Sequence, residues 1–235
     1  MAIDTSDPRG SVAVWRDGAM LGSVAHETSE DYSLWLLPAV ERVLVGAAVR
    51  MTDVDVYSVA SGPGSFTGVR VGLTTVKALA EVYGKAIVAV SRLEAIAGQA
   101  LGTAPLVAAF ANASRGQVFG AVYRRNGAGL ERLGDEMDLA PGKFVAAAAE
   151  LAGAEGISWV STDPDCVLGD EPWQERAGQK EVIERVSPFL AQAIAQVAVV
   201  RLAEGRTTDA LGLDANYVRR PDAEMLWKSV KAHGR

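Results

Sequence analysis

Residues 54–73 read VDVYSVASGPGSFTGVRVGL, and this stretch passes from an apolar run through a glycine-rich segment to an amphipathic one. The valine-rich residues 54–60 predict a strand, because β-branched side chains favour extended backbone. The glycines and proline of residues 61–67 predict a tight loop, and residues 69–83 predict a helix. The run AIVAV at 86–90 predicts a further strand. Because strand, loop, helix and strand in this order form a right-handed βαβ unit, we expect a mixed α/β sheet here.

Upstream of this unit, the sequence predicts a β-meander. Residues 2–6, 11–15 and 20–24 read as short strands joined by turns. Only three residues precede Asp4, which leaves the first strand little of the apolar lead-in that a central strand needs. We therefore expect the natural chain to start upstream of Met1.

Between residues 31 and 47, apolar side chains recur at helical spacing. Leu34, Leu37, Val40 and Leu44 fall on one stripe, which we expect to face the core. Trp35 and Leu36 lie beside that stripe, so the helix has more apolar surface than one buried face needs. We expect these two side chains to bind a second subunit. The alternative is that Trp35 completes the core, since apolar helix residues are more often buried than docked.

The second half of the chain repeats this order of elements. Its predicted strands are 106–111, 117–123, 129–137 and 157–160, and its predicted helices include one that opens at Pro141 and a long one at 189–204. We therefore predict two lobes, each a mixed α/β sheet with flanking helices. Their predicted bounds are 1–98 and 99–215, followed by a C-terminal tail at 216–235.

The composition indicates an acidic globular protein. The chain has 235 residues, a net charge of −6 and a pI of about 5.1, which argues against a broad basic face for nucleic acid. No stretch has the ~20 uninterrupted apolar residues of a membrane span, so we expect a cytoplasmic protein without membrane contact. Cys166 lies among acidic residues that would raise its thiol pKa, and one cysteine with two histidines makes no recognisable metal site.

The glycine-rich loop has two interpretations when spacing alone is considered. A helix that begins after such a loop offers its N–H groups to an anion, and Ser65 or Thr67 could cap it. However, Val69-Arg70 stands where a phosphate-binding loop of Walker type has Lys-Ser/Thr. Ser65 also lacks the flanking glycine spacing of a nucleophile elbow. Spacing alone therefore favours a tight strand-to-helix turn over a binding loop.

Residues 62–73, GPGSFTGVRVGL, closely resemble the signature of the TsaB (YeaZ) family. Supporting runs are AIDTS at 2–6, LLP at 36–38 and VSRLEA at 90–95, with weaker echoes in SRGQVF at 114–119 and NYVRR at 216–220. The likeness is strong over residues 2–98, and the second half is divergent. One departure is Tyr32, because the family commonly has a histidine just before the first helix.

This resemblance implies a two-lobed fold of the actin/Hsp70/sugar-kinase (ASKHA) type and a scaffold or dimerisation subunit. The family serves threonylcarbamoyl transfer to the adenosine next to the tRNA anticodon, with a TsaD-type catalytic subunit and a TsaE-type ATPase as partners. We expect tRNA to be reached only through that complex, and a homodimer to form when the chain is alone. In the family, the helices around the loop form the dimer interface. The expected partner-binding residues are Tyr32, Trp35, Leu36, Gly62, Pro63, Gly64, Ser65, Phe66, Thr67, Gly68, Arg70, Gly72 and Thr75.

The residues argue against an enzyme that works alone. Kinases and ATPases of this fold need a carboxylate at the end of the first strand of each lobe, where magnesium and phosphates bind. Asp4 supplies the first, but Asn112 stands at the second place and is a poorer metal ligand. We expect no catalytic residue, no metal and no cofactor beyond ATP or ADP at a partner interface. A vestigial nucleotide site would comprise Asp4, Thr5, Ser6 and Asn112. The alternatives are an ATP-dependent phosphotransferase of the same fold and a free-standing homodimeric regulator.

Overall fold

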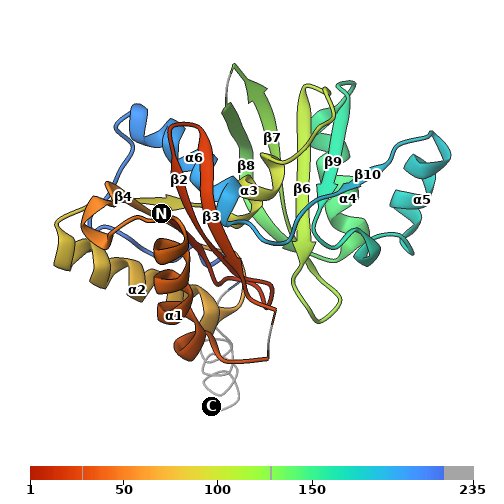
Figure 1. Ribbon diagram of the computed structural model, residues 1–235. Helices are drawn as coiled ribbons and strands as arrows, with labels where there is room; N and C mark the ends of the chain where they lie inside the picture. The colour runs from red at the N-terminus through yellow and green to blue at the C-terminus, as the bar shows by residue number, and fades with distance from the viewer. Residues whose placement is uncertain (28, 128, 220–235) are drawn as a thin grey trace, which may run out of the picture.

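The computed structural model describes residues 1–27, 29–127 and 129–219, which form two lobes, each built on a five-stranded sheet (Figure 1). The strand orders are β3-β2-β1-β4-β5 and β10-β9-β6-β7-β8. The first sheet contains β1 (Ala2–Asp4), β2 (Ser11–Arg16), β3 (Ala19–Ala25), β4 (Val56–Ala60) and β5 (Ala86–Val90). The second contains β6 (Leu106–Asn112), β7 (Val118–Asn126), β8 (Gly129–Leu139), β9 (Ile157–Ser161) and β10 (Ile183–Arg185).

The two sheets share one topology. The central strands β1 and β6 each pair antiparallel with the next strand of a meander and parallel with a later strand, β4 or β9. The register places Ile3 opposite Val12 and Val59, so that β1 is buried between two neighbours. The repeated order of elements predicted from the sequence is confirmed.

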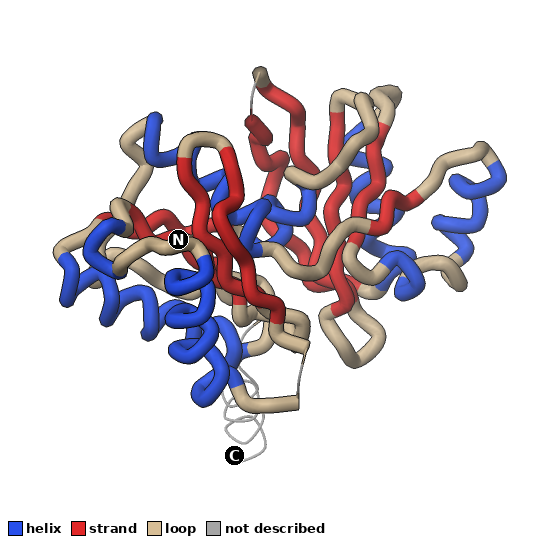
Figure 2. Tube along the Cα trace, viewed as in Figure 1, coloured by secondary structure: helices blue, strands red, loops and turns tan. Residues whose placement is uncertain are grey.

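Helices cover the outer face of each sheet and fill the space between them (Figure 2). The outer helices are α1 (Tyr32–Gly46) and α2 (Phe66–Tyr83) on the first sheet, and α4 (Pro141–Ala152) on the second, with α5 (Glu171–Gly178) packed on α4. The inner helices are α3 (Arg92–Ala97) and α6 (Ala191–Ala203). Two short 3-10 turns, η1 (Met51–Asp53) and η2 (Pro164–Cys166), complete the elements of the described chain.

The two inner helices are exchanged between the lobes. α3 follows the first sheet in the chain but packs on β6, β7 and β9 of the second. α6 comes after the second sheet but packs on β1, β2, β4 and β5 of the first. Thr208 then pairs with Ile87 at the edge of the first sheet. The predicted bounds at residues 98 and 99 fall between β5 and β6, and each inner helix packs on the sheet formed by the other half of the chain.

Helix α1 buries a face that shares only Val40 and Leu44 with the predicted stripe. Its buried residues are Trp35, Leu36, Ala39, Val40, Val43 and Leu44. Leu34 and Leu37 are instead 64% and 58% exposed. Both sets of residues have helical spacing, and the buried one includes Trp35, which packs edge-on against His26 with ring centroids 4.9 Å apart. The prediction that Trp35 and Leu36 lie outside the core is wrong.

Helix α2 begins where the glycine-rich loop ends. Ser65, one of the two caps that the sequence allows, accepts a hydrogen bond from the Gly68 N–H at 3.3 Å. Gly84, with φ of +63°, ends it in the left-handed conformation that favours glycine. None of the helices in the described residues is both long enough and apolar enough to cross a membrane. Of the predicted tail, only residues 216–219 fall within the described residues.

Candidate functional site

The glycine-rich loop is shaped by contacts with the end of β1. The Ser65 N–H donates to the Ser6 carbonyl at 2.8 Å, and Thr5 Oγ1 donates to the Gly68 carbonyl at 2.7 Å. A Cβ on Gly64 would lie 2.1 Å from the Ser6 oxygen, and one on Gly68 would lie 2.0 Å from the Thr5 oxygen. Glycine at both positions thus permits a close approach of the loop to the end of β1. The backbone that the loop approaches belongs to this chain itself.

Asp4, at the end of β1, is completely buried. Its Oδ1 accepts hydrogen bonds from the Ser6 N–H at 2.9 Å and the Ser6 hydroxyl at 2.6 Å. Its Oδ2 has no hydrogen-bond partner within the described chain. Burial raises the pKa of this carboxyl, and the hydrogen bonds from Ser6 and the charge of Arg92 oppose that rise only in part. Asp4 is therefore a buried carboxyl that Ser6 holds through one oxygen only.

A chain of ion pairs joins the two lobes at the base of the cleft between them. Arg92 is only 2% exposed and donates to Asp7 Oδ2 at 2.6 Å. Arg9 bonds to Asp7 Oδ1 at 2.9 Å and to Asp163 of the second lobe at 2.8 Å. Burial alone would raise the pKa of Asp7, but the charges of Arg92 and Arg9 outweigh it and lower that pKa. Asp7 is thus held as a carboxylate between two arginines.

Asn112 lies at the end of β6, the position in the second lobe that is equivalent to that of Asp4 at the end of β1. Its Oδ1 accepts the Ser114 N–H at 2.7 Å, and its own N–H points to Asp163 Oδ2 at 3.4 Å. Ser114 and Arg115 follow with φ of +61° and +57°, a conformation that is uncommon outside glycine. The side-chain oxygen of Asn112 therefore holds a tight turn.

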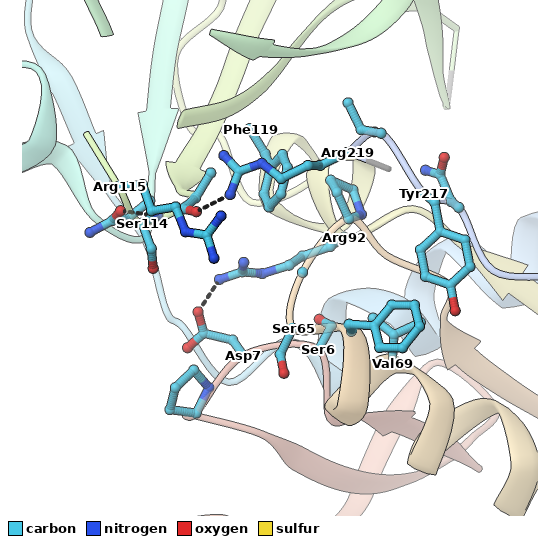
Figure 3. Close-up of a pocket in the computed structure, with 18 residues that line it drawn as sticks. Ser6, Asp7, Ser65, Val69, Arg92, Ser114, Arg115, Phe119, Tyr217 and Arg219 are labelled. Carbon is cyan, nitrogen blue, oxygen red and sulfur yellow. Dashed lines mark hydrogen bonds and ion pairs between the residues drawn. The ribbon is translucent and has the colours of Figure 1, made fainter. Parts of the chain in front are cut away.

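Between these groups lies a cavity of about 570 Å³ lined by both lobes (Figure 3). Arg92 extends across it to Asp7, and Tyr217 and Arg219 line the opposite wall. Asp7 is the acidic residue among the described residues that line it, and both of its oxygens bind arginine. Magnesium takes carboxylate and phosphate oxygens. Because two arginines engage Asp7 and Asp4 does not line the cavity, the described lining offers magnesium no free carboxylate.

A second hollow, the α1–α2 groove, lies on the outer face of the first lobe. It has a volume of about 500 Å³, and we define it by its lining residues Tyr32, Ser33, Leu36, Leu37, Phe66, Thr67, Arg70, Val71, Thr74 and Thr75. Leu37 and Phe66 are 58% and 38% exposed. The Arg70 guanidinium lies 3.7 Å from the centre of the Phe66 ring. An exposed leucine and phenylalanine beside an arginine form a surface suited to a protein partner.

The predicted partner-binding residues fall into three groups. Ser65, Phe66, Thr67 and Arg70 are exposed; Tyr32, Gly64 and Thr75 are half-buried; Trp35, Leu36, Gly62, Pro63, Gly68 and Gly72 are buried. Of the exposed and half-buried residues, Tyr32, Phe66, Thr67, Arg70 and Thr75 line the groove, whereas Gly64 and Ser65 line the cavity between the lobes. It places the Trp35 side chain in the core, where direct contact with a partner is excluded.

Tyr32 takes part in an aromatic cluster at the start of α1. Its ring lies 4.4 Å from that of His26, and its hydroxyl donates to the Asp7 carbonyl. Burial and the nearby Asp4 raise the pKa of Tyr32, so this hydroxyl stays protonated and remains a donor. The side chain that departs from the family pattern thus ties α1 to the loop after β1.

Three residues of the candidate site could not be predicted from the sequence as functional. Leu37 was assigned to the buried stripe, and its exposure depends on which face of α1 packs. Tyr217 and Arg219 lie in a run that the sequence marked only as a family echo. No local signal indicates that Tyr217 stacks on Phe66, since 151 positions separate them and the contact depends on the folded chain.

Cys166 is half-buried at the end of η2. Burial, and after it the charge of Asp163, raises the pKa of its thiol to about 12. The prediction that neighbouring acids raise this pKa agrees with the structure, although burial is the larger cause. The thiol stays protonated at neutral pH and is a poor nucleophile.

Comparison with known proteins places the chain among tRNA-modification proteins. The family model described as "TsaD: tRNA N6-adenosine threonylcarbamoyltransferase" matches residues 19–161, more than half of the chain. The protein TsaB of Bacillus subtilis, described as a tRNA threonylcarbamoyladenosine biosynthesis protein, is 27% identical over 97% of this chain and 96% of its own. TsaB of Escherichia coli is 27% identical over 98% and 97%. YeaZ from Pseudomonas aeruginosa superposes with a TM-score of 0.74 at 26% identity, covering 92% of this chain and 97% of that one. The predicted two-lobed ASKHA-like fold is confirmed.

Proposed function

Because the chain belongs to the TsaD family of tRNA N6-adenosine threonylcarbamoyltransferases, in its TsaB (YeaZ) branch, we propose that it is a partner-binding subunit for threonylcarbamoyladenosine synthesis in tRNA. The observation that carries this proposal is the α1–α2 groove, where Leu37, Phe66 and Arg70 are exposed together. A scaffold needs such a surface, whereas an enzyme needs a reactive set of side chains.

The proposed occupant of the groove is a TsaD-type protein. This chain matches the TsaD model itself, so a TsaD-type partner would carry an equivalent pair of helices. Two related folds can pack the same face against each other about a pseudo-twofold axis, as in isologous dimers. Arg70 would meet an acidic side chain of the partner, and Leu37 and Phe66 would supply the apolar centre. A second copy of this chain would compete for the same face.

Catalysis would lie with the partner. In this chain the cleft carboxylate Asp7 is engaged by Arg92 and Arg9, and Asn112 holds a turn. The TsaE-type ATPase would join the assembled complex. tRNA would also bind through that complex, because the net charge of −6 disfavours direct binding of this chain to a phosphate backbone. The competing proposal, a phosphotransferase of this fold, requires a magnesium–nucleotide site that these ligands do not suit.

The proposal is tested by a substitution that places a charged side chain in the groove. Leu37→Asp should weaken binding of the TsaD-type protein from the same organism by about thirtyfold, or ~2 kcal/mol, because it puts an unpaired carboxylate at an apolar contact. The matched control is Val82→Asp, which alters a 75% exposed side chain near the C-terminal end of α2, outside the groove. Sedimentation velocity of the mixed proteins reports binding. Reconstituted tRNA modification, read by mass spectrometry of nucleosides, should fall with it.

Three outcomes would count against the proposal. Equal binding by both variants would place the partner elsewhere. Loss of self-association alone, with partner binding intact, would favour the homodimeric regulator. Modification of tRNA by the isolated chain, or rapid turnover of ATP by it, would show an enzyme.

A further inference from the structure

The last described residues, 216–219, cross from the first lobe to the second, and we call them the strap (Figure 3). The Asn216 N–H donates to the Ser61 carbonyl at 2.8 Å, just before the glycine-rich loop. Its side-chain amide donates to Glu136 Oε2 on β8 at 2.6 Å. One residue thus binds both lobes.

Tyr217 joins the strap to the α1–α2 groove. Its ring stacks on Phe66 with the centroids 5.3 Å apart and the planes inclined by 29°. Arg70 Nε donates to the Tyr217 hydroxyl at 2.9 Å while the same guanidinium lies over Phe66. Tyr217 therefore orders the two side chains that carry the groove's aromatic and positive character. Side chains ordered before binding lose less entropy when a partner arrives.

Arg219 anchors the strap on the second lobe. It makes a two-pronged contact with Asp138, at 2.6 and 2.7 Å, and also donates to Gln117 Oε1 at 2.5 Å and the Ala113 carbonyl at 3.1 Å. The side chains of Arg219 and Asp138 are 21% and 16% exposed, so water screens this pair less than a surface pair. A bidentate arginine fixes direction as well as distance.

The glycine-rich loop is shaped to receive the strap. Gly62 has φ of +112°, which side chains rarely adopt, and a Cβ there would lie 2.7 Å from the Asn216 carbonyl oxygen. Val218 also packs against the core between the sheets. The strap is thus seated on both lobes.

We propose that the strap is part of the docking surface. Tyr217, 39% exposed, contacts the partner together with Phe66, and Arg219 is a positioning residue that holds Tyr217 there from the second lobe. The partner face that fits is apolar with an acidic side chain opposite Arg70. This inference rests on the proposed function, because the partner is the TsaD-type protein that docks in the groove.

The test compares Tyr217→Ser, Tyr217→Phe and Arg219→Gln in the full chain. Tyr217→Ser and Arg219→Gln should each weaken binding of the TsaD-type protein about tenfold, whereas Tyr217→Phe keeps the stack and should change it less than threefold. The double variant Tyr217→Ser/Arg219→Gln should bind no worse than Tyr217→Ser, since Arg219 acts through Tyr217. Arg124→Gln is the control, because it removes an exposed bidentate pair with Glu155 on the second lobe away from the strap.

Hydrogen–deuterium exchange of the free chain supplies a readout without the partner. Arg219→Gln should speed exchange in the peptide that contains Asn216 and in the first turn of α2, and Arg124→Gln should leave both unchanged. Asp138→Asn removes the same anchor from the other side and should reproduce the effect, so a folding defect peculiar to one variant is recognised.

Each result decides a different claim. Faster exchange in Arg219→Gln with full binding, while Leu37→Asp weakens binding, would overturn the strap's role and leave the proposed function standing. Unchanged exchange would overturn the anchoring. Full binding by Leu37→Asp would overturn the docking surface itself.

Discussion

Asp7 is the residue on which the charge balance at the base of the cleft depends. It neutralises Arg92, which is almost fully buried, and joins it through Arg9 to Asp163 of the other lobe. A buried guanidinium is tolerated only when it is paired, because transfer from water costs several kcal/mol. One carboxylate thus serves both the folding of the first lobe and its contact with the second.

Replacing that carboxylate should be costly. Asp7→Asn should lower the free energy of unfolding at pH 7 by about 3 kcal/mol, because Arg92 stays buried without its counter-ion. The folded-state pKa of Asp7 is lowered, so its stabilisation is present above pH ~4 and is lost as pH falls through the folded pKa. The difference between variant and wild type should be constant above pH ~5 and shrink below pH ~4.

Urea unfolding across that pH range measures the difference. Asp165→Asn, in an exposed pair with Arg185, is the control and should change stability little at any pH. A gap that persists undiminished to the lowest pH would show that the loss comes from packing and not from charge.

The fold itself requires glycine at position 68, independently of any role of this residue in partner binding. Gly68→Ala should lower the free energy of unfolding by about 3 kcal/mol, since the added Cβ meets the Thr5 backbone oxygen at 2.0 Å. Gly46→Ala, at the end of α1 with open space around it, should be neutral or stabilising by up to ~1 kcal/mol. Thermal melts of both variants decide the matter. A fully stable Gly68→Ala would mean that the loop can move away from β1.

At the scale of the element, the two faces of α1 have different roles: one is packed in the core and stabilises the fold, and the other is proposed to bind the partner. One face packs Trp35, Leu36 and Val40 on the sheet, and the other exposes Leu34 and Leu37. The two faces share one helical period, so neighbouring residues differ completely in burial. Variants of adjacent positions should therefore have opposite effects.

Trp35→Ala should cost about 3–5 kcal/mol of stability and leave the association of each folded molecule unchanged, because the side chain lies wholly in the core. Leu37→Ala should do the reverse, with a small effect on stability and weaker association. Chemical denaturation and sedimentation with the TsaD-type protein provide both values. Weaker association of folded Trp35→Ala at full stability would restore the original expectation that Trp35 docks.

At the scale of the whole molecule, the exchanged inner helices make the two lobes depend on each other. The inner face of the first sheet is covered by α6, which arrives only after the second sheet. The core between the sheets draws on both halves, including Val88, Ile96, Val107 and Ile194. The core between the two sheets therefore needs residues from both halves of the chain.

A fragment of residues 1–98 should therefore not fold by itself. It lacks α6 and leaves the inner face of β1, β2, β4 and β5 exposed to water. We expect no cooperative thermal transition by circular dichroism and binding of a hydrophobic dye, while the full chain melts in one step. Adding a peptide that spans α6 serves as the matched rescue. A cooperative, monomeric fragment would show that the lobes are independent domains.

Much of the architecture follows from local chemistry that can be read along the chain. Valine-rich runs make strands, the glycines at 62, 64 and 68 mark a tight turn, and Ser65 caps the helix that follows. The repeated order of strands predicts two similar sheets because each step depends on neighbouring residues. The same motif carries the family, and with it the region where partners are expected.

Only the tertiary structure decided which surfaces remain for function. It turned Leu37 outward and Trp35 inward, exchanged α3 and α6 between the lobes, and brought Tyr217 onto Phe66. Periodicity shows that a helix has apolar stripes, but the stripe that is buried depends on the volume and shape of what packs against it. Contacts between distant residues, such as Arg219 with Asp138, depend on the path of the whole folded chain, which local sequence propensity does not determine.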